Sequence, residues 1–181
     1  MTVYIGIDPT AGRRPIHYAV LDEKLRIVAQ GEGDLEAVLA VVGGYESAVC
    51  AVDAPQSPNG RLLAEPEVRQ RLGLLPYTTV WAQFKVCEYL LRRHGIGIYN
   101  TPSDVNAAKR WMRVGWELYD RLRAAGYTLF KNGTAKGYVE AHPHACFTTL
   151  LGHLPYKKNT LEGRLQRQLI LAECDVDVPD A

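Results

Sequence analysis

The stretch VYIGIDPTAGRRPIHYAVLD (residues 3–22) contains two runs rich in β-branched and aromatic residues, at 3–8 and 17–22. Such runs, separated by a turn, predict β-strands. The first run ends in Asp8, directly before a Pro-Thr-Ala-Gly turn at 9–12. A carboxylate at the end of a buried strand costs free energy unless a partner compensates it. Asp8 is therefore either a turn residue that bonds nearby backbone N–H groups or part of a functional site.

The residues after this stretch extend the pattern into a sheet. Segment 26–33 follows the short turn DEKL and predicts a third strand of an antiparallel meander. Asp34 is a suitable N-cap for a helix at 35–44, which ends in two glycines. The apolar run 47–55 predicts a central strand buried on both faces. It ends in a second isolated acid, Asp53, which repeats the pattern of Asp8.

Helical spacing dominates the middle of the chain. It predicts helices over 65–74, 79–95 and 103–127, the last capped by Ser103 or Asp104. These segments form a helical insertion at about 61–130 within a single domain spanning residues 1–181.

The last third of the chain returns to the sheet before it becomes helical again. A final strand at 137–147 carries Glu140, and helices follow at 145–152 and 161–173. The chain then ends without a recognisable further element.

Composition excludes several classes of protein. With 21 basic and 20 acidic residues the net charge is +1, so any attraction to nucleic acid must come from a local basic site. No apolar run approaches the roughly 20 residues of a membrane helix. Four distant cysteines without metal-site spacing, and no signal peptide, predict free thiols in a cytoplasmic protein. They are Cys50, Cys87, Cys146 and Cys174.

The order of elements is that of a ribonuclease H-like α/β fold: three antiparallel strands, a helix, a strand, helices and another strand. In that fold the first and fourth strands are parallel neighbours, which brings Asp8 and Asp53 together across 45 positions. Two apposed carboxylates repel each other, and a divalent cation between them keeps both ionised. A pair of Mg²⁺ or Mn²⁺ ions about 4 Å apart would support hydrolysis of a phosphodiester.

Several segments together resemble one protein family, domain of unknown function 429, whose members are predicted ribonuclease H-like nucleases. They are GIDPTAGRRPIHYAVLD, AVDAPQSPNGR, CEYLLRRHGIGIYNTPS, VEAHPHACFTTLLG and LPYKKNTLEGRLQRQLIL. The resemblance spans nearly the whole chain and implies that the family's acids correspond to Asp8, Asp53 and Glu140, the expected metal ligands and catalytic residues. The other matched positions are Pro55, Pro143, Phe147, Lys157, Lys158, Gly163, Arg164 and Arg167.

Two further groups of residues are candidates for the site. His142 and His144 alternate along a strand or turn and would point to one side, where they would hold zinc, assist proton transfer or serve only in hydrogen bonding. A second group, on a loop and the helix after it, forms either a phosphate-binding patch or a solvated helix face, with two arginines three positions apart on one side. It consists of Lys157, Lys158, Arg164 and Arg167.

The resemblance implies a further C-terminal helix that can carry another acid, and we expect that helix to be missing or trimmed here. Asp175 and Asp177 are either a replacement or part of a solvated tail.

The resulting hypothesis is a nuclease that depends on Mg²⁺ or Mn²⁺ and acts on nucleic acid of unspecified type. Two alternatives use the same fold: a non-catalytic binding module, and a nucleotide-binding protein similar to actin or the sugar kinases. In the second, GIDPTAGR (6–13) would be the phosphate hairpin. The sequence contains no second glycine-rich phosphate loop, and it does not indicate an oligomeric state.

Overall fold

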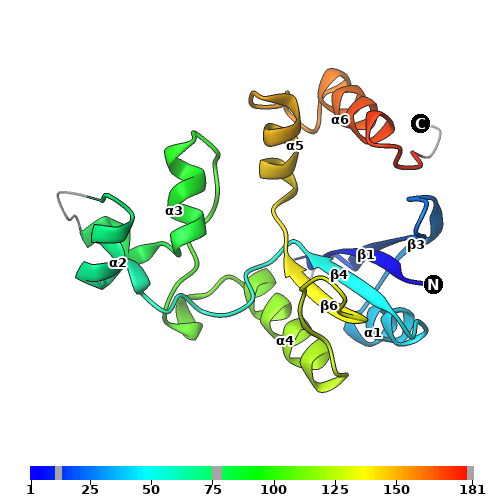
Figure 1. Ribbon diagram of the computed structural model, residues 1–181, viewed down its shortest axis with the longest axis horizontal. Coiled ribbons are helices and arrows are strands. Elements are labelled where there is room, and N and C mark those ends of the chain that lie inside the picture. Colours follow the sequence, from blue (N-terminus) through cyan, green and yellow to red (C-terminus); the bar gives the residue numbers. More distant parts are fainter. Residues whose placement is uncertain (11–13, 75–78, 179–181) are drawn as a thin grey trace.

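The structure, a computed structural model, describes residues 1–10, 14–74 and 79–178. Within these ranges six strands form one sheet, in the order β3-β2-β1-β4-β6-β5 (Figure 1). The strands are β1 (Val3–Asp8), β2 (Ile16–Leu21), β3 (Ile27–Gly33), β4 (Ala48–Val52), β5 (Thr128–Leu129) and β6 (Lys136–Glu140). The α-helices are α1 (Leu35–Gly43), α2 (Pro66–Arg71), α3 (Val86–Arg93), α4 (Arg110–Ala124), α5 (Pro143–Leu151) and α6 (Leu161–Glu173). Three short 3₁₀ helices are η1 (Leu62–Ala64), η2 (Thr79–Gln83) and η3 (Val105–Ala107).

The sheet is mixed, antiparallel at one side and parallel at the other. β1 pairs with β2 and β2 with β3 in antiparallel fashion, which confirms the predicted meander. β1 and β4 are parallel neighbours, as the order of elements predicts. β6 and the two-residue strand β5, which the sequence pattern does not reveal, complete the parallel side. The predicted α/β class, with a mixed sheet flanked by helices, is therefore confirmed.

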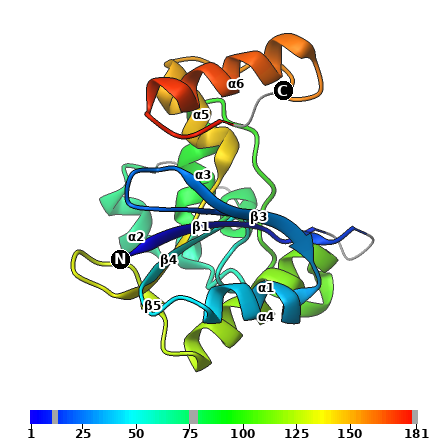
Figure 2. The ribbon, with the colours of Figure 1, turned by 90° about the vertical axis from the view of Figure 1, so that its right-hand side faces the viewer.

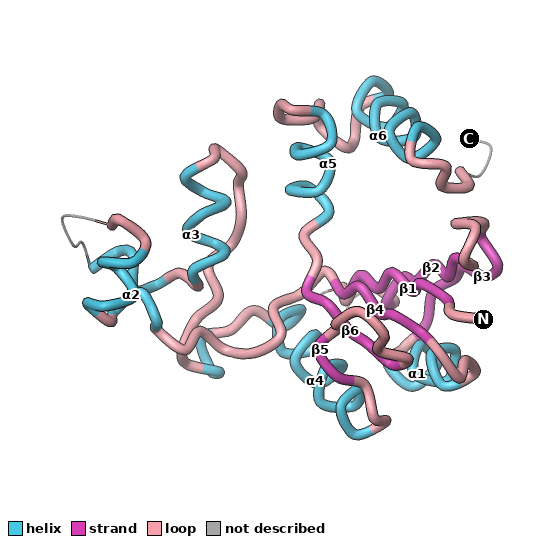
Figure 3. The backbone as a smooth tube through the Cα atoms, viewed as in Figure 1, coloured by secondary structure: helices cyan, strands magenta, loops and turns pink. Residues whose placement is uncertain are grey.

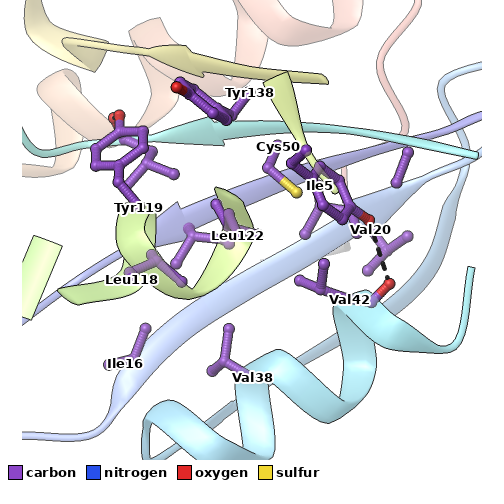
Figure 4. Close-up of a cluster of buried hydrophobic side chains, with 14 of the residues drawn as sticks. Ile5, Ile16, Val20, Val38, Val42, Cys50, Leu118, Tyr119, Leu122 and Tyr138 are labelled. Carbon is purple, nitrogen blue, oxygen red and sulfur yellow. Dashed lines mark hydrogen bonds between the residues drawn. The ribbon is translucent and has the colours of Figure 1, made fainter. Parts of the chain in front are cut away.

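Helices α1 and α4 cover one face of this sheet (Figure 2). Residues alternate along β1, so Val3, Ile5 and Ile7 are buried and the residues between them are exposed. The buried strand residues belong to one cluster with Val38 of α1 and Leu118 of α4, and Figure 4 shows Ile5 in this cluster. Asp34 caps α1 as predicted, because its side chain accepts a hydrogen bond from the Ala37 N–H at 2.9 Å.

Helices α5 and α6 lie on the opposite side of the sheet from α1 and α4 (Figure 2). α5 leaves directly from the end of β6, and the segment after α6 returns to β3. There the Asp177 N–H donates to the Leu25 carbonyl (3.0 Å), and the Ile27 N–H donates to the Asp177 carboxylate (3.2 Å). Asp177 is exposed, as a solvated tail predicts, and its hydrogen bonds also connect the end of α6 to the sheet.

Three predicted elements have different boundaries. The helix predicted at 79–95 is split into η2 and α3 by extended backbone at Lys85. The helix predicted at 103–127 likewise begins as η3, which Asp104 caps, and α4 starts only at Arg110. The strand predicted at 137–147 ends at Glu140, because Pro143 occupies the first turn of α5.

The segment between β4 and α4 carries α2 and α3, which lie to one side of the sheet (Figure 3). The predicted turn at 9–12 and the hairpin at 6–13 fall partly outside the described residues.

All four cysteines are free, and burial raises the pKa of the Cys50 thiol to about 12. Among the described helices, none combines the length and apolar character that crossing a membrane requires.

Gly115 sets the distance between α4 and the segment after β4. A Cβ atom at this position would lie 2.4 Å from the Cβ of Ala54 and 3.9 Å from a ring carbon of Pro9. Ala54 and Pro9 directly follow Asp53 and Asp8. The packing of α4 therefore supports the backbone that carries both acids.

We expect Gly115→Ala to destabilise the protein by about 1–3 kcal/mol, because the added methyl group has no space in a packed contact. Helix propensity alone would favour alanine by about 1 kcal/mol. Gly43→Ala is the matched control, since nothing lies within 4 Å of a Cβ placed there. Urea unfolding of the three proteins measures both effects, and a Gly115→Ala variant as stable as the control would contradict the close contact.

Candidate functional site

The register of β1 and β4 places their two acids side by side. Ile7 is opposite Val52, and the Asp53 N–H donates to the Ile7 carbonyl at 2.9 Å. Asp8 and Asp53 follow these paired residues, so they leave adjacent parallel strands at the same level. Both side chains extend from the face opposite to the buried core.

The two carboxylates influence each other directly. Protein atoms around the Asp8 carboxyl and the nearby charge of Asp53 raise the pKa of Asp8, while Lys158 and His17 lower it by less. This holds although the Asp8 side chain is exposed by its surface area, because neighbouring atoms still displace part of its hydration. No described residue donates a hydrogen bond that would favour the Asp8 carboxylate. The pair therefore carries a repulsion that a cation would relieve.

Glu140 reaches the same region from the other face of the sheet. It pairs with Val52, one position before Asp53, so its side chain leaves β6 on the side of the core. Its Oε2 atom accepts a hydrogen bond from the Gln56 N–H (3.0 Å) and lies 3.6 Å from the Lys85 ammonium. Glu140 is therefore already compensated in charge by the protein.

His142 is the histidine that contacts the acids. It lies just before α5, with its Nδ1 atom 3.8 Å from Oδ1 of Asp53. Asp53 raises the pKa of His142, against the effect of burial. The Nε2 atom is buried and has no hydrogen-bond partner among the described residues. The backbone of Gly97 also raises the pKa of His142, so the imidazole lies between Asp53 and the segment after α3.

His144 occupies a different environment. It lies in the first turn of α5, so the two histidines alternate along a turn and not along a strand. Its ring is perpendicular to that of His142, with centroids 6.3 Å apart. Burial, His142 and Arg167 lower its pKa.

A pocket of about 770 Å³ joins these groups. Its lining comes mainly from the ends of β1, β4 and β6, residues 97–99 and 101 after α3, the start of α5, and the loop 155–158 before α6. Glu88 of α3, Trp111 of α4 and Arg167 of α6 complete it. Asp8, Asp53, Glu140, His142 and His144 all belong to the lining. The pocket therefore lies at the carboxyl ends of the parallel strands, where open α/β sheets bind their ligands.

The predicted basic residues separate into two groups. Lys157, Lys158 and Arg167 line the pocket, and the charge of Lys158 acts on Asp8. Arg167 uses its Nη1 atom to donate to the carbonyls of Tyr156 (3.0 Å) and Gly163 (2.6 Å). Arg164 is exposed and is not part of the pocket lining.

A metal site requires several donor atoms close together. Considering residues 1–10, 14–74 and 79–178 only, no group of three or more His, Cys, Asp or Glu side chains is arranged to hold one. Asp8 and Asp53 both supply oxygen donors. Among the described residues, the cationic side chains near them include Lys158, His17 and His142. Mg²⁺ is commonly bound by one or two carboxylates and keeps several waters. The pair fits one such ion.

Sequence reasoning missed the residues that support the site. Tyr119 of α4 lies with its hydroxyl 3.2 Å from the Ala54 carbonyl and 3.3 Å from the Val139 carbonyl, so it ties together the ends of β4 and β6. Buried Glu88 accepts hydrogen bonds from Thr101 and from the Lys85 N–H, which orders the segment beside the pocket. No local pattern in the sequence indicates these partners.

The fold and site define an α/β protein with an acidic pocket at the ends of its parallel strands. Residues 6–181 match the family described as "Protein of unknown function (DUF429)", and the chain belongs to that family. No curated protein and no solved structure is significantly similar to it.

Replacing Asp8 with asparagine tests the repulsion between the two acids. Because folding raises the pKa of Asp8, the native state disfavours the ionised form. This free-energy cost is absent well below about pH 4, where the carboxyl group is protonated in both the folded and the unfolded state. It is complete above the pKa of the folded state. In a chelator, Asp8→Asn should therefore match the wild type in acid and exceed its stability at pH 7.5, by less than about 1 kcal/mol because solvent screens the pair.

Urea unfolding at pH 3.5 and pH 7.5 measures this difference. A loss of roughly 1 kcal/mol at pH 7.5 would instead identify Asp8 as a turn residue that accepts a backbone hydrogen bond.

Proposed function

We propose that this protein is a phosphodiester hydrolase that depends on Mg²⁺ or Mn²⁺ and cleaves nucleic acid, on a ribonuclease H-like sheet. The observation that carries the proposal is that Asp8 and Asp53 line one pocket together with Lys158 and His142. The order β3-β2-β1-β4-β6, antiparallel and then parallel, supports the assignment of the fold.

Asp8 and Asp53 are the residues we propose as metal ligands, with Glu140 as a further acid whose charge Lys85 compensates. A divalent cation bound there would polarise a phosphoryl oxygen and favour deprotonation of a water. Two directly coordinating carboxylates match one ion more closely than two.

The remaining residues have roles that follow from their positions. Lys157 and Lys158 bring positive charge to the acidic end of the pocket, where a phosphate must approach two carboxylates. His142 has the position of a proton donor to the leaving oxygen, since it lies in the pocket beside Asp53. In the reaction, water attacks phosphorus and loses a proton to solvent, the P–O bond to the leaving group breaks, and the leaving oxygen takes a proton from the protonated imidazole. The imidazole regains a proton from solvent.

Metal binding can be tested separately from catalysis. A saturating ion stabilises the native state by mass action, by about 2.7 kcal/mol at 100 times its dissociation constant. We expect Mn²⁺ to raise the unfolding temperature of the wild type and to leave Asp53→Asn unchanged. Asp120→Asn is the control, because Asp120 is exposed and pairs with Arg123 away from the pocket. Equal Mn²⁺ shifts in all three proteins would contradict a metal site at Asp53.

The role of His142 is tested by turnover of a labelled oligonucleotide in Mn²⁺. We expect His142→Gln to lower the rate by about 10²- to 10⁴-fold, the usual contribution of a positioned acid or base, while the Mn²⁺ shift in thermal unfolding is retained. His153→Gln is the control, since His153 bonds only locally, to the Leu154 carbonyl. A wild type that binds Mn²⁺ and nucleic acid but cleaves neither DNA nor RNA would make the protein a binding module.

A further inference from the structure

Two tyrosines of the pocket lining leave most of their surface in solvent. Tyr99 is 62% exposed and Tyr156 is 63% exposed. They come from different segments, one after α3 and the other from the loop before α6. Exposed aromatic side chains in a concave site are typical contacts for flat ligands, because the rings offer large apolar faces with little conformational entropy to lose.

The main chain of Tyr156 is held on both sides. Its N–H donates to the Gln166 side chain (2.9 Å), and its carbonyl accepts from Arg167 (3.0 Å). Gly163 permits this arrangement, since a Cβ there would lie 2.0 Å from the Lys157 carbonyl and 3.0 Å from that of Tyr156. The loop therefore presents an exposed ring and two lysines from a fixed backbone.

This packing gives Gly163 and Arg167 a structural part in the site. Both residues lie in segment 163–167 (GRLQR), and both contact the loop that carries Tyr156 and Lys157. Arg167 also stacks on Phe147 of α5, 5.5 Å from the ring centroid. Arg167 is thus a positioning residue, which orients the loop from α6.

Tyr99 is supported in a comparable way on the other side. The Lys109 ammonium lies 3.7 Å from its ring centroid, and Trp111 packs against it at 6.2 Å. The cation orients the ring and adds positive charge near it. Aromatic and basic side chains therefore lie together in the pocket lining and beside it, while the acids lie at the strand ends.

We infer that the pocket binds single-stranded nucleic acid, with bases stacked on Tyr99 and Tyr156 and the backbone phosphates near Lys157 and Lys158. This inference rests on the proposed function, and it specifies the substrate. In a duplex the faces of the bases are already stacked, whereas an unpaired strand can place them on aromatic rings. A volume of about 770 Å³ is that of a small-molecule site and suits an unpaired nucleotide segment.

The test measures binding in EDTA, where turnover is prevented. The probes are a labelled 12-nucleotide DNA strand, the same sequence as RNA, the matching DNA duplex, and adenosine monophosphate as competitor. We expect both single strands to bind at least about tenfold more tightly than the duplex. Tyr156→Ala and Tyr99→Ala should each weaken single-strand binding by about 5- to 100-fold, the range found when a stacking residue is truncated.

Two further variants separate stacking from a general loss of structure. Tyr156→Phe keeps the ring and should weaken binding less than Tyr156→Ala. Tyr4→Ala is the matched control, because Tyr4 is an exposed tyrosine of β1 outside the pocket and should leave the affinity unchanged. Circular dichroism verifies that each variant is folded.

The outcomes distinguish this inference from the proposed function. Equal affinity for single strand and duplex, or alanine variants that bind like the wild type, would overturn the inference even if the protein cleaves DNA in Mn²⁺. Tight binding of the mononucleotide without binding of either strand would overturn it in favour of a small-molecule site. Strand binding that depends on both tyrosines, without cleavage in Mn²⁺, would support the inference and reject the hydrolase.

Discussion

The parallel pairing of β1 with β4 is the constraint on which the candidate site depends. Both strands run in the same direction and are in register, so the chain leaves them at the same edge of the sheet. The hydrogen bond from the Asp53 N–H to the Ile7 carbonyl continues the ladder up to the two acids. An antiparallel or shifted pairing would separate Asp8 from Asp53 by several residues, or turn one of them toward the core. The proximity of the acids is therefore a consequence of sheet formation, stabilised by burial of Ile5, Ile7 and Val52 on the core face of the sheet.

The charges around this edge divide between the two faces of the sheet. On the core side, Glu140 is neutralised by Lys85 and by the Gln56 N–H, and Tyr119 joins the neighbouring strand ends. On the open side, Asp8 and Asp53 repel each other and receive only partial compensation from Lys158 and His142. One acid is thus part of the architecture and two remain available to a ligand. This division is the physical basis for proposing Asp8 and Asp53 as the metal ligands.

Helices α5 and α6 complete the pocket. They are attached to the sheet at both ends, by the junction of β6 with α5 and by the return of Asp177 to the start of β3. Because Gly163 allows the 155–158 loop to lie directly on α6, the basic and aromatic groups of that loop are held over the acids without a large core beneath them. Helix α6 leaves Leu161, Leu165 and Leu169 exposed. This exposure indicates that α6 is stabilised more by specific contacts at its ends than by burial of an apolar face.

The sequence by itself determined the elements whose signals are local. Alternation and β-branched residues defined β1, β2 and β4, a capping Asp34 defined the start of α1, and the lone acids after two strands indicated where a site would form. It could not reveal that Arg167 supports a loop or that Glu140 lies on the opposite face from Asp53. Those properties depend on strand register and on partners in other segments, such as Lys85 for Glu140 and Tyr156 for Arg167. Tertiary structure decided them, because a charged side chain takes its role from the groups that surround it after folding, and local periodicity contains no information about those groups.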